Sequence, residues 1–109
     1  MSDAVIEITD DNFEKEVLQS PVPVMLDFWA EWCGPCRMLS PVVEEVGREF
    51  SSRVKVGKLN VDDSPKTATR YNVMSIPTLV FFKGGKEADR SIGVAPKSDV
   101  KRRVESLLH

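Results

Sequence analysis

The chain contains few of the residues on which several classes of small protein depend. It has 109 residues, with two cysteines, one histidine and one tyrosine. A structural zinc site normally needs four Cys or His ligands, and here the only histidine is His109. Two cysteines are also too few for the disulfide framework of a small secreted protein, which fits a reducing compartment. We therefore expect neither a metal site nor a disulfide-stapled fold.

The sequence also lacks an excess of one charge and a long apolar run. It has 15 Lys and Arg against 17 Asp and Glu, so the basic field typical of nucleic-acid binders is absent. The longest apolar run, Val22 to Ala30, is interrupted by Pro23 and Asp27 and is shorter than the roughly 18 residues that span a bilayer. The N-terminus does not resemble a signal peptide. We expect a cytoplasmic protein without membrane or nucleic-acid partners, or alternatively a mature form in the chloroplast stroma or mitochondrial matrix.

The length predicts a single domain, residues 1–109. Hydrophobic periodicity predicts strands and helices in the order β-α-β-α-β-α-β-β-α. The predicted strands are Val5–Ile8, Val24–Ala30, Val54–Val61, Thr78–Phe82 and Lys86–Ile92. The predicted helices are one capped by Thr9 or Asp10, a second over Gly34–Phe50, a third begun by Ser64-Pro65 and ended by Asn72, and a fourth over Lys97–Leu108. This order describes an α/β sandwich with a mixed sheet.

Both cysteines lie in Cys33-Gly34-Pro35-Cys36, where the second helix is predicted to begin. A disulfide across so short a loop gains only about 2 kcal/mol in the loop-entropy model, so stabilisation does not explain the pair. At a helix start, free backbone amides and the helix dipole favour a thiolate at Cys33, whereas Cys36 is one turn further in and more sheltered. The pattern indicates a reversible dithiol–disulfide centre; two buried, inert cysteines are the alternative.

Asp27 is the second candidate functional residue, because it interrupts a strand that is apolar on both faces. Burying an unpaired carboxylate costs several kcal/mol and raises its pKa. Lys58, on the next predicted strand, is the candidate charge partner. The alternatives are that Asp27 reaches water and that Lys58 is an ordinary solvated lysine.

These features together resemble the thioredoxin family. The resemblance rests on Trp32-Cys33-Gly34-Pro35-Cys36, on Asp27 in the preceding strand, on Ile76-Pro77-Thr78 and on Gly93, and it covers essentially the whole chain. It implies the thioredoxin fold, a three-layer α/β/α sandwich whose mixed sheet of about five strands is flanked by about four helices. It also implies a general protein-disulfide reductase, in which Cys33 attacks the target disulfide and Cys36 resolves the mixed disulfide.

The resemblance implies further roles for individual residues. Asp27 would transfer protons to and from Cys36, and Lys58 would interact with Asp27. The Ile76-Pro77 bond would be cis, and the backbone of Ile76 would pair with the substrate chain. The substrate-binding residues would be Trp32, Gly34, Pro35, Ile76, Pro77, Gly93 and Val94.

The implied partners are disulfide-containing target proteins and a thioredoxin reductase, either an NADPH-dependent flavoprotein or a ferredoxin-dependent enzyme. The protein would be a monomer with no bound cofactor besides its redox-active disulfide. Two other functions stay open: a disulfide oxidase or isomerase with the same fold, and a binding module whose thiols are incidental.

Overall fold

The computed structural model describes residues 4–109, in which nine elements follow the predicted order. The strands are β1 (Ile6–Glu7), β2 (Val24–Trp29), β3 (Lys55–Asn60), β4 (Thr78–Lys83) and β5 (Lys86–Ile92). The helices are η1 (Glu14–Leu18), α1 (Gly34–Glu49), α2 (Pro65–Arg70) and α3 (Lys97–Leu107). The predicted fold class, an α/β sandwich with a mixed five-stranded sheet and four helices, is confirmed.

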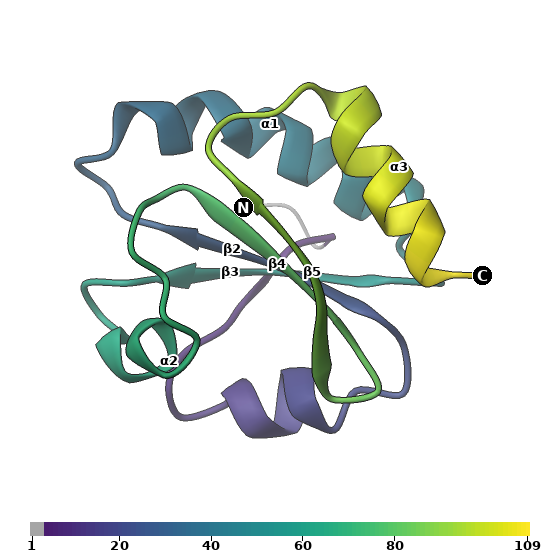
Figure 1. Cartoon of the computed structure of the whole chain (residues 1–109), viewed down its shortest axis with the longest axis horizontal. Coiled ribbons are helices and arrows are strands. Elements are labelled where there is room, and N and C mark those ends of the chain that lie inside the picture. Colours follow the sequence, from purple (N-terminus) through teal and green to yellow (C-terminus); the bar gives the residue numbers. More distant parts are fainter. Residues whose placement is uncertain (1–3) are drawn as a thin grey trace.

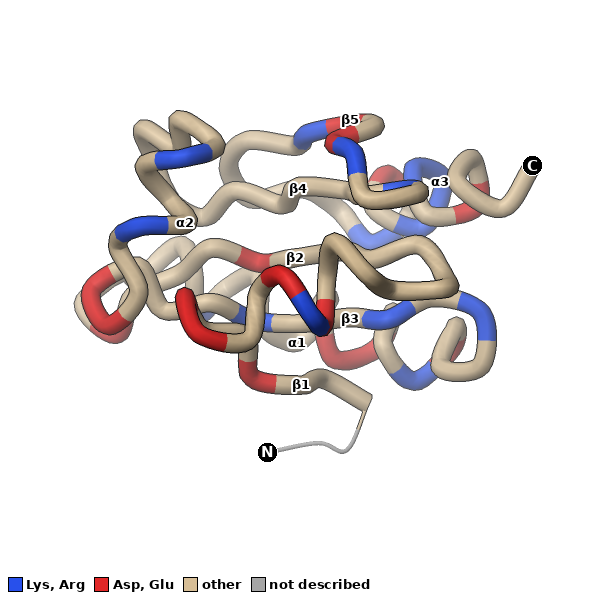
Figure 2. Tube along the Cα trace, turned by 90° about the horizontal axis from the view of Figure 1, so that it is seen from below, with Lys and Arg blue, Asp and Glu red and all other residues tan. Residues whose placement is uncertain are grey.

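The sheet has the strand order β1-β3-β2-β4-β5, and Figure 2 shows it face-on with the strands side by side in this order. Strand β2 is central, parallel to β3 and antiparallel to β4, and a β4–β5 hairpin forms one edge. Five of the six residues of β2 are buried, as expected for a strand that is covered on both faces. Positively and negatively charged residues are interspersed along the helices and loops in Figure 2.

Helices α1 and α3 cover one face of the sheet, and α2 and η1 cover the other (Figure 1). Successive residues of a strand point to opposite faces, so each strand contributes to two cores. In β2, Met25 packs in the core beneath α1 and α3, whereas Leu26 and Phe28 pack in the core on the α2 side. This alternation places Asp27 on the same face as Met25, which is the face covered by α1.

The first helix and the first strand differ from the prediction, whereas α1 begins at Gly34 as predicted. Helix η1 is a single π-turn, closed by a hydrogen bond from the Gln19 amide to the Glu14 carbonyl (2.9 Å), rather than a longer α-helix. Thr9 does cap the preceding turn, since its hydroxyl accepts a hydrogen bond from the Asn12 amide (3.3 Å). Strand β1 is also shorter than predicted, with two residues.

The side chains of Asp10 and Ser64 do not cap the helices for which the sequence predicts them. The Asp10 carboxylate accepts hydrogen bonds from the amides of Lys66 (3.1 Å) and Thr67 (2.8 Å), which are the free donors of the first turn of α2. Ser64, the predicted cap of α2, instead accepts a hydrogen bond from the Asp10 amide (3.1 Å). The reciprocal pair ties the loop after β1 to the start of α2.

Residues 4–109 lack two further features. No helix in this range is both long and apolar enough to cross a bilayer. The same range contains no group of three or more His, Cys, Asp or Glu side chains arranged to hold a metal ion.

Candidate functional site

A disulfide joins Cys33 and Cys36 at the N-terminus of α1, with their Cα atoms 5.3 Å apart. Cys33 is the N-cap residue, with an extended backbone, and Pro35 lies in the first turn. The Cys33 sulfur accepts a hydrogen bond from the Cys36 amide (3.1 Å), one of the four donors that a helix start leaves free. The local sequence therefore places Cys33 where a developing negative charge is stabilised by the helix.

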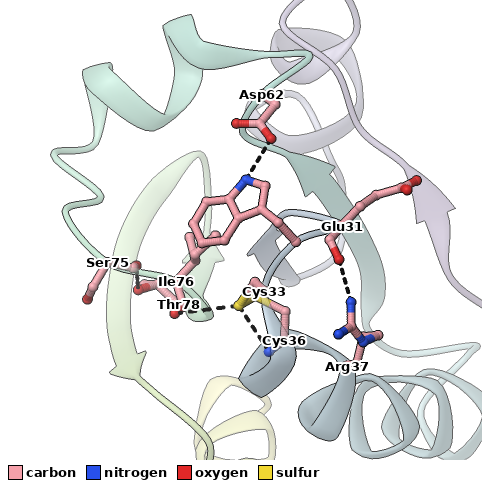
Figure 3. The surroundings of a disulfide bond; sticks show 9 residues. Glu31, Cys33, Cys36, Arg37, Asp62, Ser75, Ile76 and Thr78 are labelled. Atoms are coloured by element: carbon pink, nitrogen blue, oxygen red, sulfur yellow. Dashed lines mark hydrogen bonds between the residues drawn. A yellow bond between two sulfur atoms is a disulfide. The ribbon is translucent and has the colours of Figure 1, made fainter.

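Both cysteines are buried in this oxidised form, Cys33 at 4% and Cys36 at 2% exposed. The predicted difference in solvent exposure between Cys33 and Cys36 is therefore small. The two sulfurs differ more in what surrounds them. The Cys33 sulfur lies 3.9 Å from the carbonyl oxygen of Ile76, which belongs to the segment that faces α1 across the disulfide (Figure 3).

The segment opposite the disulfide is held from two sides. The Ile76-Pro77 peptide bond is cis, as the resemblance to thioredoxins implies. The Thr78 hydroxyl donates a hydrogen bond to the Ser75 carbonyl (2.7 Å), and the Gly93 amide donates one to the Pro77 carbonyl (2.8 Å). Pro77 itself is buried, so it supports the segment from within rather than lining the surface.

Exposed apolar side chains surround this position. Trp32 is 70% exposed, and its indole N–H donates a hydrogen bond to the Asp62 carboxylate (2.9 Å), which fixes the orientation of the ring. Val94 is 47% exposed and follows Gly93, whose φ of 89° lies in the left-handed region that favours glycine. The predicted rim residues Trp32, Gly34, Pro35, Ile76, Gly93 and Val94 are all at least partly exposed.

The structure adds residues that the sequence reasoning missed. A groove of about 290 Å³ lies next to Trp32, lined also by Val61, Ala68, Val73, Met74, Ser75 and Ile76. Met74 is 84% exposed, and together with the exposed Trp32 it gives this groove an apolar lining. Its position two residues before Ile76-Pro77 is the one signal by which it could have been found. Asp62 gave no such signal, because its contact with Trp32 spans 30 residues of sequence.

Asp27 lies beneath α1 and is completely buried. Neither of its carboxylate oxygens has a hydrogen-bond partner among the described residues. Burial raises the pKa of Asp27 from 3.8 to about 7, because the charged form loses its hydration, and the positive charge of Lys58 opposes this only in part. The alternative that Asp27 reaches bulk water is wrong in this structure. Asp27 thus combines a near-neutral pKa with a place on the sheet face below the helix that carries Cys36.

Lys58 is the direct neighbour of Asp27 in the parallel β2–β3 register, but the two side chains form no hydrogen bond. The Lys58 ammonium instead donates to the Ser40 hydroxyl of α1 (3.1 Å) and lies 4.6 Å from the centre of the Trp29 ring. Lys58 therefore acts on Asp27 through its electric field rather than by direct contact.

The fold and this site together define a class of protein. A disulfide across two residues at a helix start, next to an exposed apolar rim and above a buried acid, is the arrangement of a thiol–disulfide oxidoreductase with a dithiol–disulfide centre.

Comparison with known proteins identifies the family. The sequence model of the family described as "Thioredoxin" matches residues 4–106. The chain is 47% identical over 105 residues to "Thioredoxin 1" of Nostoc sp., covering 96% of this chain and 98% of the relative. It is 48% identical over 102 residues to "Thioredoxin M-type, chloroplastic" of Chlamydomonas reinhardtii, covering 94% and 73%. It is 49% identical over 96 residues to "Thioredoxin" of Rickettsia prowazekii, covering 88% and 91%. The chain belongs to the thioredoxin family, and its Cys33–Cys36 pair is the dithiol–disulfide centre of a protein-disulfide reductase.

Proposed function

We propose that Cys33 and Cys36 have unequal roles in the reduction of protein disulfides. The Cys33 thiolate attacks one sulfur of the target disulfide, whose bond breaks, and the other target sulfur leaves as a thiolate. The Cys36 thiolate then attacks the Cys33 sulfur, which releases the second target sulfur. Two electrons pass to the target, its two thiolates take up protons, and this protein is left with the Cys33–Cys36 disulfide.

The observation that carries this assignment is the position of the Cys33 sulfur. It accepts the amide hydrogen of Cys36 at the N-terminus of a helix of 16 residues. The same sulfur lies 3.9 Å from the carbonyl oxygen of Ile76, one of the rim residues. Stabilisation of negative charge favours Cys33 as the attacking thiolate, and access from the rim favours it as the sulfur that meets the target.

Asp27 is proposed as the group that takes the proton from Cys36 during resolution. A general base works best when its pKa is close to the working pH, and the pKa of Asp27 is about 7. Lys58 is proposed to tune Asp27, because its positive charge favours the carboxylate. A proton can pass between Asp27 and Cys36 directly or through one water molecule.

Target proteins are proposed to bind as extended segments across the rim. The backbone of Ile76 would pair with the target chain by strand addition, which reads no side chains and so accepts many sequences. Trp32, Val94 and the backbone of Gly34, Pro35 and Gly93 would supply apolar contact area and close approach, with Pro77 positioning Ile76 from below.

We further propose that the protein acts as a monomer of one domain, recharged by a thioredoxin reductase of the NADPH-flavoprotein or ferredoxin-dependent type. Its electrons would come from that reductase, with no cofactor bound to this chain. The relatives include cyanobacterial and chloroplast proteins by name. A cytoplasmic location is proposed, with the chloroplast stroma or mitochondrial matrix as the alternative for a mature form.

Two serine variants test the assignment of the thiols. Cys36→Ser leaves the attacking thiol without a resolving partner, so this variant should accumulate a mixed disulfide with insulin whose disulfides are intact. Mass spectrometry of the intact adduct detects it. Cys33→Ser is the matched control and should form far less adduct. Adduct on Cys33→Ser at the same rate, or full reductase activity in that variant, would show that the roles are assigned wrongly.

A further inference from the structure

The segment that faces the disulfide begins at a turn with unusual backbone geometry. Asn72 follows α2 with φ of 54°, the only residue other than glycine with positive φ in the described chain. The Asn72 amide donates to the Thr69 carbonyl (3.0 Å) and the Val73 amide donates to the Ala68 carbonyl (2.9 Å). These two bonds form a Schellman motif, which ends α2 and turns the chain toward Ile76.

Arg90 of β5 holds this turn from outside the segment. Its Nη2 donates to the Tyr71 carbonyl (2.6 Å) and its Nη1 to the Asn72 carbonyl (3.4 Å). The other side of the guanidinium is bound by Glu87, which accepts from Nε (2.8 Å) and from Nη2 (2.9 Å). The planar fork of arginine can make both sets of bonds at once, which a lysine ammonium cannot do with the same geometry.

A β-bulge explains why Glu87 and Arg90 lie on the same face of β5. Residues three apart in a regular strand point to opposite faces. Here Phe81 pairs with Asp89 and Phe82 pairs with Glu87, so one extra residue lies between them. The extra residue brings Glu87 to the face of Arg90, which is the side of the sheet covered by α2.

Asp89, which lies between Glu87 and Arg90 in the strand register, points to the opposite face of the sheet. Asp89 accepts two hydrogen bonds of 2.8 Å from Arg103 of α3, which packs on the α1 side of the sheet. The two arginines therefore have separate structural tasks. Arg103 ties α3 to β5, whereas Arg90 ties β5 to the turn that leads into the groove next to Trp32.

The Arg90–Glu87 pair is well suited to hold a backbone turn. Their side chains are only 24% and 31% exposed, and the guanidinium meets Glu87 in a two-bond arrangement. The hydrogen bond that Arg90 donates to Glu87 raises the pKa of Arg90, so its charge is constant over the working pH range. Charge-assisted hydrogen bonds of this kind are about twice as strong as neutral ones.

We propose that Arg90 is a positioning residue for target proteins: by fixing the carbonyls of Tyr71 and Asn72 it holds Val73–Ile76 in the shape that docks an extended target segment. The inference rests on the proposed mode of target binding. It predicts that loss of Arg90 impairs recognition of protein disulfides, whereas small disulfides, which need no strand pairing, react as before.

The test compares two disulfide substrates: insulin in turnover, with dithiothreitol present to re-reduce the protein, and 5,5′-dithiobis(2-nitrobenzoate) in a single turnover of the pre-reduced protein. Arg90→Ala should raise the KM for insulin about fivefold with kcat within about twofold. Its rate with 5,5′-dithiobis(2-nitrobenzoate) should stay within about twofold of wild type. Arg90→Lys should recover part of the insulin KM, and Glu87→Gln should show a smaller loss of the same kind. Arg102→Ala is the control, because Arg102 is an exposed arginine that pairs with Asp99 on α3.

An equal loss with both substrates, or an unchanged KM for insulin, overturns the proposal. If Arg90→Ala does not fold, Arg90→Lys and Glu87→Gln carry the same comparison. Hydrogen exchange of the Asn72 and Val73 amides tests the positioning separately from the function. These amides should exchange about tenfold faster in Arg90→Ala, relative to amides of α1. A wild-type protein that reduces no insulin would refute the proposed function, and the exchange result would still decide whether Arg90 holds the turn.

Discussion

Asp10 and Asp27 carry the same side chain into opposite surroundings. Asp10 lies at the N-terminus of α2, where it accepts hydrogen bonds from Lys66 and Thr67. Burial alone would raise the pKa of Asp10, but the bonds from Thr67 and Lys66 outweigh it and lower the pKa below 3.8. Asp27 is buried with no hydrogen-bond partner among the described residues, and its pKa rises to about 7.

The comparison shows how one fold separates stability from chemistry. A carboxylate with three donors contributes to the folded state and has no reason to exchange its proton near pH 7. A carboxyl group without donors destabilises the folded state when it ionises, but it exchanges its proton at the pH where thiols react. We therefore expect Asp27 to serve proton transfer at a cost in stability, and Asp10 to serve stability alone. Substitution of each aspartate tests this difference.

The largest effect is expected from Asp27→Asn. A folded-state pKa of about 7 against 3.8 in the unfolded chain means that the unfolded state loses its proton first as pH rises. Stability should therefore fall between about pH 4 and pH 7, by up to about 4 kcal/mol at about 1.4 kcal/mol per pH unit. Asp27→Asn should lack this fall. Urea unfolding at pH 4 and pH 8 measures it, and equal pH dependence in both proteins would contradict the buried, unpaired state of Asp27.

The same variant should separate the two chemical steps. Without the Asp27 carboxylate, Cys36 loses its proton acceptor, so resolution of the mixed disulfide at pH 7 should slow by about tenfold or more. Attack by Cys33 should change little. Rapid-quench measurement of adduct formation and decay distinguishes the two steps. If Asp27→Asn slows only the formation of the adduct, Asp27 acts on Cys33 and its assignment to Cys36 is wrong.

A smaller and opposite effect on stability is expected from Asp10→Ala. Loss of the cap should destabilise the protein by about 1 kcal/mol at pH 7. Because the folded-state pKa is lowered, the contribution is present above the unfolded value of 3.8 and is lost as pH falls through the folded value. Denaturant titration at pH 7 and pH 2.5 tests this. Asp11→Ala, at the exposed neighbouring residue, is the control, and an equal loss there would argue against the cap.

The smallest effect is expected from Lys58→Met. Removal of the positive charge takes away the one influence that lowers the pKa of Asp27, so this pKa should rise further. The pH at which resolution reaches half its maximal rate should move upward, with the maximal rate kept. Lys55→Met is a matched control on the same strand, since Lys55 pairs with Glu16. A downward shift, or the same shift in both variants, would contradict the field effect.

Most of the element order could be read from the sequence because its signals are local. Apolar periodicity marks α1 and α3 through contacts four residues apart, and the nearly continuous apolar run marks β2. Predictions from the sequence were wrong where a side chain binds a partner that is distant in the sequence. Asp10 has the residue type of a cap for the helix that follows it, yet its donors lie 56 and 57 residues away.

The sequence by itself determined that a helix begins at the two cysteines and that an aspartate lies within a buried strand. Both features depend on neighbours within a few residues. Only the tertiary structure decided what meets them. The Ile76 carbonyl reaches Cys33 from 43 residues away, and Arg90 reaches the turn after α2 through a β-bulge. Such contacts follow from strand register and the packing of two sheet faces, which no local pattern encodes.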